Sequence, residues 1–361
     1  MKKIIIKLPF LSEEIYIGGG ISDFVTRKIY SRDYDKVVVV TDHNVLRKYN
    51  RNLKDLLKFK IQDLIIVRPI SKHKDYEHVK IITQRMVAKK LTRKSCLIAI
   101  GGGYVADITG FAASIYMRGI DFIEIPTTLI AMGDPVIGKV AVNFFGYKNI
   151  LGSFYSPRFV FCDTNFLKTL NTRELVLGLV EIWKHGIISH NKKIIKDIDA
   201  YLRVNKLSNP INLIHLSITV KRKYVERDYR DMRGPHKALS LGHTFANYFE
   251  NKFKIRHGEA VFYGIILATI LASNLKLITE NRRRKIFYIA KLFERYLGLL
   301  QYLQSKIITT NLLKEIKFDK INSHNKYTFV LPTETGYRIE SEIPAKILRQ
   351  TVNKFIGLKG F

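Results

Sequence analysis

Short apolar runs alternate with helical patterns along the first part of the chain. The runs Lys36–Thr41 (KVVVVT), Leu64–Val67 and Cys96–Ile100 are almost continuously apolar, which is typical of parallel strands buried on both faces. A helical pattern over Glu77–Leu91 separates two of these runs, and Ile120–Ile125 continues the series. This alternation predicts an α/β fold with a doubly wound, Rossmann-like parallel sheet.

The ends of the chain carry further elements. Ile4–Lys7 and Ile15–Ile17 predict a first hairpin, and a helix is expected from about Ser22. Tyr327–Leu331 predicts a late strand, and Pro344–Phe355 predicts a closing helix.

After Asn171 the apolar residues recur every three or four positions, as in amphipathic helices. The predicted helices are Glu174–Ile188, Ile211–Arg227, Thr244–Phe253, Ala260–Leu275 and Arg283–Leu300. A length of 361 residues is enough for two cores. We therefore expect a Rossmann-like domain over residues 1–160 and a mainly helical domain over residues 161–361.

Composition indicates an ordinary globular chain, with 47% apolar and 25% charged residues. No apolar run approaches the length of a membrane span, and the N-terminal stretch MKKIIIKLPF is too short for a signal peptide. We expect a cytoplasmic protein without membrane association. Cys96 and Cys162 both lie in apolar runs, so we expect two reduced core residues.

The formal net charge of +30 has two interpretations. Positive charge attracts polyanions or focuses an anionic substrate, but it also follows from a general bias toward lysine. The basic residues are spread along the chain with only short clusters such as Arg282–Lys285. Aromatic residues are not interleaved with them as in single-strand binders. We favour the compositional bias and do not expect a nucleic-acid partner.

Three glycines, Gly101–Gly103, follow an apolar run and precede a helical pattern. Such a turn lets the backbone approach a pyrophosphate at a helix N-terminus, although a tight strand-to-helix turn also needs glycine for steric reasons. Asp42 and Asn44 likewise follow a predicted strand. At such a position they could either contact a ligand or cap the next helix.

Nine motifs extend this picture along nearly the whole chain. They are, in order, GGGYVADITGF, YMRG, IPTTLIAMGD, GKVAVN, GYKN, DTNFLKTL, LGLVEIWKHG, LGHTF and HGEAV. Together they resemble the 3-dehydroquinate synthase family of sugar phosphate cyclases. The resemblance implies that family's fold, an NAD-binding Rossmann-like domain followed by a helical metal-binding domain.

The resemblance also implies a divalent metal, Zn²⁺ or Co²⁺, held by Glu181, His243 and His257. One carboxylate and two imidazoles leave a coordination position open, as in catalytic zinc sites. Lys184 follows Glu181 by one helical turn, so both side chains project from one face.

The family's cofactor positions imply bound NAD. The matching residues here are Asp42, Asn44, Lys74, Gly101, Gly102, Gly103, Asp107, Thr127, Thr128, Lys148, Phe166, Thr169, Leu170 and Glu174. Two nearby positions depart from the family, Ala106 in place of glycine and Ser71 in place of glutamate. We interpret NAD binding as retained.

The remaining matches concern the substrate, a small anionic sugar phosphate. The implied catalytic residues are Asp134, Lys139, Lys184, Lys221 and Asn247. The implied substrate-binding residues are Arg118, Lys139, Asn149, Lys221, His236, Lys237, Ser240 and Lys320. In the family Arg118 would reach across a subunit interface, which implies a homodimer.

Several of these positions depart from the family pattern. The loop Asp134–Lys139 is one residue short and contains Pro135, which fixes φ and lacks an N–H. Asn247 replaces a histidine, and an amide takes up no proton at neutral pH. Ser240 replaces an asparagine. The family's carboxylate-binding arginine becomes either His236 or Lys237.

The resemblance implies a lyase that closes a carbocycle. A ring hydroxyl is transiently oxidised, phosphate is eliminated, and after re-reduction and ring opening an intramolecular aldol step forms 3-dehydroquinate from a heptulosonate 7-phosphate. That reaction belongs to the shikimate pathway of aromatic amino acid biosynthesis.

Other functions stay open. The losses on the carboxylate side also fit a cyclase for a non-carboxylate sugar phosphate, of the 2-deoxy-scyllo-inosose or sedoheptulose 7-phosphate type. A metal-dependent polyol dehydrogenase, a degenerate NAD-binding relative and, on charge alone, a nucleic-acid binder are further alternatives.

Overall fold

The computed structural model describes residues 1–9, 11–49, 63–67, 74–232, 234–317 and 328–360. The chain divides into two compact units. The first comprises Met1–Asn171 and Pro210–Arg230, and the second comprises Thr172–Asn209 and Asp231–Phe361. The sequence pattern predicts a single border at residues 160–161, whereas the chain changes unit three times, because the helix beginning at Pro210 packs with the first unit.

A seven-stranded sheet forms the centre of the first unit, in the order β1-β2-β9-β6-β5-β3-β4. Its strands are β1 (Lys2–Lys7), β2 (Ser12–Gly18), β3 (Val37–Asp42), β4 (Asp63–Val67), β5 (Cys96–Gly101), β6 (Asp121–Pro126) and β9 (Phe159–Asp163). Only β1 runs antiparallel to its neighbour. The predicted doubly wound parallel sheet and its first hairpin are confirmed.

The central strands are buried along their whole length. Every residue of β3 and of β5 is buried, because helices cover both faces of the sheet. Cys96 and Cys162 are buried and free, as expected.

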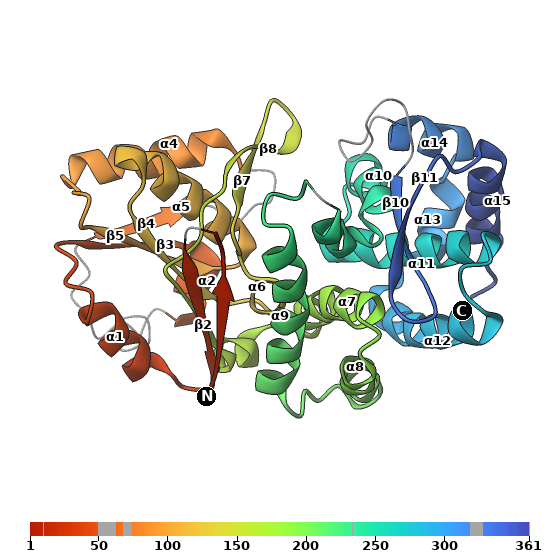
Figure 1. The fold of residues 1–361 in the computed structure, drawn as a ribbon, viewed down its shortest axis with the longest axis horizontal. Coiled ribbons are helices and arrows are strands. Elements are labelled where there is room, and N and C mark those ends of the chain that lie inside the picture. The colour runs from red at the N-terminus through yellow and green to blue at the C-terminus, as the bar shows by residue number, and fades with distance from the viewer. Residues whose placement is uncertain (10, 50–62, 68–73, 233, 318–327, 361) are drawn as a thin grey trace. The chain divides into compact units, whose positions relative to one another are not determined.

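Helices connect the parallel strands of the first unit. They are α1 (Ser22–Tyr30), α2 (His43–Tyr49), α4 (Tyr76–Ala88), α5 (Gly103–Ile115), α6 (Leu129–Gly133) and α9 (Pro210–Arg227), with 3₁₀ turns η2 (Tyr116–Arg118) and η3 (Thr164–Thr169). Right-handed crossovers in opposite directions along the sheet place α4 and α5 on one face and α1 and α2 on the other. Figure 1 shows α4 and α5 side by side.

A second hairpin, absent from the sequence prediction, follows α6. It consists of β7 (Val140–Phe144) and β8 (Tyr147–Ser153). The residues of β8 are mostly exposed, so no apolar alternation marks this strand. The hairpin packs against α5 at Gly110, where a Cβ would lie 2.6 Å from Val140 Cγ1.

The second unit is mainly helical, as predicted. Its elements are α7 (Thr172–Ile188), α8 (Lys192–Val204), η4 (Pro235–Ser240), α10 (His243–Phe253), α11 (His257–Asn274), α12 (Glu280–Leu297), α13 (Leu300–Lys306), α14 (Thr309–Lys317), β10 (Thr328–Pro332), β11 (Tyr337–Ser341) and α15 (Ala345–Ile356). The pattern did not predict α8, α13, α14 or β11. Helix α11 lies at the core, with nearly every residue buried against α7, α10, α12 and α15.

Helix ends follow local chemistry more than apolar spacing. The predicted helix Arg283–Leu300 instead ends at Leu297, because Gly298 adopts a left-handed conformation with φ of 65°. Among the described residues, no helix combines the length and the apolar character needed to cross a membrane.

Candidate functional site

The glycine turn joins the end of β5 to the start of α5. A Cβ on Gly101 would lie 2.8 Å from Val105 Cβ, whereas a Cβ on Gly103 would meet no heavy atom within 4 Å. Gly101 is therefore required for packing, and Gly103 faces open space. At this point the N-terminus of α5 is accessible to an anionic group.

Other predicted cofactor residues lie at the carboxyl ends of neighbouring strands. Asp42 Oδ1 accepts from the backbone N–H groups of Asn44 at 2.8 Å and Val45 at 3.0 Å. The Thr128 hydroxyl accepts from Ala131 N at 3.2 Å. Both side chains therefore cap helices, while Asn44 is exposed. Thr127 donates its N–H to Gly101 O at 2.8 Å, which connects the ends of β6 and β5.

The 3₁₀ turn η3 lies beside α2. Tyr49 packs edge-on against the Phe166 ring at 5.0 Å and donates to Phe166 O at 3.1 Å. Lys48 Nζ donates to Thr169 O at 2.5 Å. These contacts bring Phe166, Thr169 and the adjacent Leu170 close to the strand end at Asp42. Glu174 belongs to the second unit, where it pairs with Arg256.

Lys74 connects two other predicted residues. Its Nζ lies 2.5 Å from Asp107 Oδ2 and donates to Asn149 Oδ1 at 2.7 Å. Asp107 also accepts from Ala141 N at 3.1 Å. The structure thus brings predicted cofactor and substrate residues into one polar cluster between α5 and the β7–β8 hairpin.

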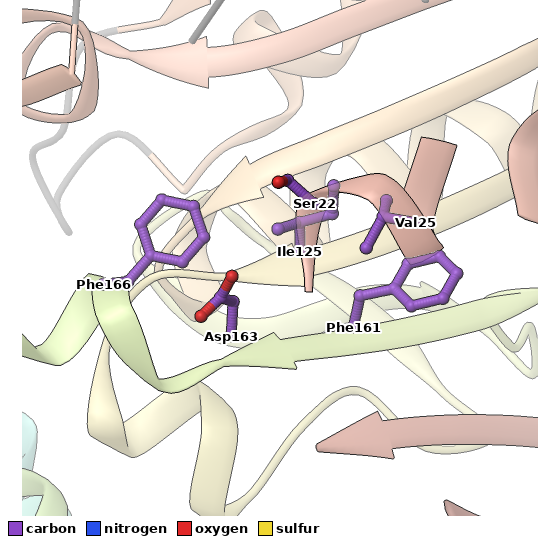
Figure 2. A pocket seen from close by; sticks show the side chains of 6 residues that line it. All are labelled: Ser22, Val25, Ile125, Phe161, Asp163 and Phe166. Atoms are coloured by element: carbon purple, nitrogen blue, oxygen red, sulfur yellow. The ribbon is translucent and has the colours of Figure 1, made fainter. Parts of the chain in front are cut away.

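Figure 2 shows a small cavity between α1, β6, β9 and η3. It is lined by Ser22, Val25, Ile125, Phe161, Asp163 and Phe166, and its volume is about 10 Å³. That space suits one water molecule at most. Asp163 is already held there, since it accepts from Gly20 N and Ile21 N at 2.9 Å. The cavity is therefore a packing defect and not a ligand site.

The shortened loop Asp134–Lys139 is fixed by α9. Lys221 Nζ lies 2.6 Å from Asp134 Oδ1 and donates to Pro135 O at 2.5 Å. Gly138 has φ of +75°, and a Cβ there would lie 2.6 Å from Tyr229 Cε2. Glycine is therefore required at this bend of the loop.

The predicted phosphate-binding side chains are exposed. They are Arg118, Lys139, Lys148 and Asn149. Arg118 and the preceding Met117 both have positive φ, 69° and 49°, a conformation that costs energy for residues other than glycine. Exposed cations are suited to an anionic ligand arriving from solvent.

The predicted metal ligands converge in the second unit. One ligand atom from each of Glu181, His243 and His257 lies within 4.8 Å of the others. His257 Nε2 is 3.2 Å from Glu181 Oε1, and the two imidazole centroids are 5.3 Å apart. Gly242, with φ of 82°, places His243 at the start of α10, where a Cβ on residue 242 would lie 2.8 Å from Ile265 N.

Neighbouring groups orient these ligands. Lys184 Nζ donates to Glu181 Oε2 at 2.6 Å, on the shared helix face that the spacing predicts. Glu181 Oε1, the other carboxylate oxygen, is buried and faces His257 Nε2. His257 Nδ1 is 2.8 Å from Glu250 Oε1, and His243 Nδ1 is 3.3 Å from Leu241 O. The Nε2 atoms of both histidines therefore point away from Glu250 and Leu241.

Electrostatics set the protonation states of the group. Burial raises the pKa of Glu181, but Lys184 and the two histidines hold it well below the usual range. Burial and Lys184 lower the pKa of His243 to about 4. Burial lowers the pKa of His257, yet hydrogen bonds to Glu181 and Glu250 raise it overall to about 10. At neutral pH, Glu181 and His243 are thus in the forms that bind a cation, whereas His257 carries a proton that a bound cation would displace.

The other predicted residues of this unit lie near η4 and α10. His236 is buried, and Lys237 and Ser240 are half-buried on η4. Asn247 lies one turn after His243 on α10 and is half-buried. Lys320 and Ser71 lie outside the described residues.

Sequence reasoning did not identify Glu250 as a partner of His257. The available signal was spacing, because Glu250 follows His243 by two helical turns and therefore shares its helix face. It also did not identify Glu13 and Glu124, two buried carboxyl groups near Lys221.

A doubly wound α/β unit and a helical unit bearing a carboxylate–histidine group define the dehydroquinate synthase-like class of sugar phosphate cyclase folds. The 2-epi-5-epi-valiolone synthase of Streptomyces hygroscopicus subsp. jinggangensis 5008, solved with NAD⁺ and Zn²⁺, has a TM-score of 0.85 at 21% identity, covering 97% of this chain and 98% of that one. A 2-deoxy-scyllo-inosose synthase complexed with carbaglucose-6-phosphate, NAD⁺ and Co²⁺ has a TM-score of 0.83 at 22% identity, covering 98% and 100%.

Sequence comparison narrows the class. The profile of the 3-dehydroquinate synthase N-terminal region matches residues 64–177, and that of the C-terminal region matches residues 178–321. A 3-dehydroquinate synthase of Alkaliphilus metalliredigens (strain QYMF) is 37% identical over 351 residues, covering 93% of this chain and 94% of the relative. The chain belongs to the 3-dehydroquinate synthase family.

Proposed function

We propose that the chain is an NAD- and divalent-metal-dependent lyase that converts a heptulosonate 7-phosphate to 3-dehydroquinate. The observation that carries this proposal is the convergence of Glu181, His243 and His257 in a chain of this family. The same reasoning gives an enzyme of the shikimate pathway that acts in the cytoplasm, where sugar phosphates and NAD are available.

The residues fit a divalent metal. Glu181 Oε1 is buried and lies 3.2 Å from His257 Nε2, and the other oxygen of Glu181 is held by Lys184. A buried carboxylate whose free side is directed at two imidazoles is a donor set that suits a divalent cation. Zn²⁺ and Co²⁺ both accept such a mixed ligand set. Bound NAD and the bound metal supply transient hydride acceptance and Lewis-acid polarisation, respectively.

The residues fit NAD as well. Gly103 leaves open space at the N-terminus of α5, which suits the pyrophosphate. Asp42, Asn44 and the threonines at the end of β6 lie at adjacent strand ends, where ligands bind in open α/β sheets. We assign the remaining cofactor positions to the same group.

The chain's own residues then bind and orient the substrate. Exposed Arg118, Lys139 and Lys148 supply positive charge for its phosphate, and Asn149 supplies an amide. Asp134 and Lys221 hold each other at 2.6 Å and present a carboxylate and an ammonium to ring hydroxyls. Elimination breaks the C–O bond to phosphate after loss of the proton beside the ketone.

The substrate class depends on whether the site binds a carboxylate. Either His236 or Lys237 supplies the positive charge for a substrate carboxylate, and Lys320 adds a late lysine. Asn247 stands where the family has a histidine, so another group must carry out the proton transfer of that histidine. If neither His236 nor Lys237 binds a carboxylate, the chain is instead a cyclase for a sugar phosphate without a carboxylate.

We also propose a homodimer. The β7–β8 hairpin exposes Phe144, Phe145, Tyr147 and Ile150, and Met117 beside Arg118 is exposed as well. Clustered exposed apolar side chains of this kind are typical of interaction surfaces. Sedimentation of the purified chain tests this assembly.

The test of function is phosphate release by the purified chain with NAD and Zn²⁺. The heptulosonate 7-phosphate, sedoheptulose 7-phosphate and glucose 6-phosphate are compared in parallel. Release with the first supports the proposal, and release only with either of the others assigns the cyclase for a non-carboxylate sugar phosphate. His243→Ala should lose both bound metal and turnover, whereas His215→Ala, in the first unit, should keep both. Accumulation of NADH without phosphate release would indicate a dehydrogenase.

A further inference from the structure

Two buried carboxyl groups of the first unit have no role in the site described above. Glu13 on β2 is 0% exposed, and Glu124 on β6 is 1% exposed. Both oxygens of Glu13 and Glu124 Oε1 make no hydrogen bond to the described residues. Buried acids with unsatisfied oxygens destabilise a fold unless a charge or a ligand compensates them.

Strand register places the two carboxyl groups on the same face of the sheet. Ile15 of β2 and Glu124 of β6 both pair with Val160 of β9. Glu13 precedes Ile15 by two residues and therefore points to the same side. Lys221 of α9 is the cation that interacts electrostatically with both acids.

The remaining carboxyl oxygen of the two acids, Glu124 Oε2, contacts the shortened loop. Glu124 Oε2 accepts from the backbone N–H of Val136 at 3.1 Å. Pro135 has no N–H, and its carbonyl accepts from Lys221 Nζ at 2.5 Å. One acid and one lysine thus satisfy the carbonyl and the N–H of the same peptide bond, between Pro135 and Val136.

Helix α9 also contacts the residues where α6 ends and the loop begins. Ser217 Oγ donates to Gly133 O at 2.9 Å, and Lys221 lies 2.6 Å from Asp134 Oδ1. Ser217 and Lys221 are one helical turn apart on α9, so one helix face holds three consecutive residues, Gly133 at the end of α6 and then Asp134 and Pro135 of the loop. Glu124, on strand β6, holds the next residue, Val136.

We propose that Glu124 is a positioning residue that, together with Lys221, fixes the Asp134–Lys139 loop so that Asp134 and Lys139 face the substrate. A loop one residue shorter than the family pattern, with a proline in place of a donor, needs these two side-chain anchors. The substrate role of the loop rests on the proposed function, whereas the anchoring rests on the contacts above.

Two substitutions separate the hydrogen bond from the charge. Glu124→Gln keeps a carbonyl acceptor for Val136 N, whereas Glu124→Met keeps the length of the side chain and removes the acceptor. Val160→Ala is the matched control, because it opens a cavity beside Glu124 in the neighbouring strand and leaves Glu124 and Lys221 in place. All three are compared with the full-length wild-type chain.

The first readout is hydrogen exchange of the Val136 amide, which needs no turnover. We expect exchange about tenfold faster in Glu124→Met and unchanged in Glu124→Gln and Val160→Ala. Equal exchange in Glu124→Met and wild type would overturn the proposal. The proposal would also fail if Val160→Ala exchanged as fast as Glu124→Met. The faster exchange would then reflect a general loosening of the fold.

The second readout is kcat/KM for the sugar phosphate that wild type uses. We expect a loss of roughly 10- to 100-fold in Glu124→Met, as for misplaced site residues, and rescue to within about threefold in Glu124→Gln. Full activity in Glu124→Met despite fast exchange would show that anchoring does not matter for catalysis and would overturn the positioning role. If wild type turns over none of the three sugar phosphates, the proposed function fails, and the exchange result still decides the anchoring.

Discussion

Lys184 Nζ donates to Glu181 Oε2 at 2.6 Å, and this leaves Glu181 Oε1 facing His257 at 3.2 Å. The lysine thus neutralises one side of the buried carboxylate and directs its other side toward the histidines. Glu250 does the same for His257, since it holds Nδ1 at 2.8 Å. Residues outside the proposed ligand set therefore orient Glu181 and His257.

Removing Glu250 should therefore weaken metal binding without removing a ligand. We expect Glu250→Ala to raise the Kd for Zn²⁺ about 10- to 100-fold, as for other partners of ligating histidines. Competition with a chromophoric chelator measures this affinity. Glu77→Ala, at an exposed glutamate of the first unit, is the control and should bind Zn²⁺ like wild type. Unchanged affinity in Glu250→Ala would contradict the orienting role.

The glycine turn offers a pair of substitutions that separates binding from folding. Gly103→Ala places a methyl group in open space, so we expect little change in Tm and at least about tenfold weaker NAD binding. Gly101→Ala brings its Cβ to 2.8 Å from Val105 Cβ, so we expect a lower Tm. Calorimetric NAD titration and thermal unfolding measure the two effects. Wild-type NAD affinity in Gly103→Ala would place the pyrophosphate elsewhere.

The buried acids predict a stability that falls with rising pH. Burial, opposed by Lys221 and by the Val136 N–H and reinforced by Asp107 and Asp134, raises the pKa of Glu124 from 4.5 to about 8. Between these values the folded chain binds more protons than the unfolded chain. Its free energy of unfolding therefore decreases as pH rises through this window, by at most about 1.4 kcal/mol per pH unit for one such group.

Glu124→Gln removes that group's contribution. We expect its Tm to fall less than that of wild type between pH 5 and pH 9, measured by scanning calorimetry in matched buffers. Burial and Glu124 also raise the pKa of Glu13, so Glu13→Met should flatten the profile further. Parallel profiles for wild type and both variants would exclude a titrating pair in this window.

The Asp134–Lys221 pair predicts unequal effects of its two members. Lys221→Met removes both the ion pair and the hydrogen bond to Pro135 O, whereas Asp134→Asn leaves the second contact in place. We expect both variants to raise KM, but only Lys221→Met to speed exchange of loop amides by about tenfold. Steady-state kinetics and hydrogen exchange on the same samples test this. Equal exchange rates in the two variants would contradict the anchoring by Lys221.

Much of the fold can be predicted from the sequence, because the strongest signals in it are local. Buried valines in β3, the run Cys96–Ile100 and the turn at Gly101–Gly103 follow from residue type and period over a few positions. The three residues that we propose as metal ligands, Glu181, His243 and His257, could also be predicted from sequence, since they lie in ordered motifs, and the structure brings them together. The β7–β8 hairpin was not, because its exposed residues lack alternation.

Contacts between residues far apart in the sequence could not be predicted in this way. The pairing of Glu250 with His257 depends on the angle between α10 and α11, and the placement of Glu13 and Glu124 facing Lys221 depends on strand order. The tertiary structure also placed α9 in the first unit, although its apolar spacing is indistinguishable from that of the helices of the second unit. Periodicity and capping are set by neighbours along the chain, whereas these contacts are set by how separate elements pack.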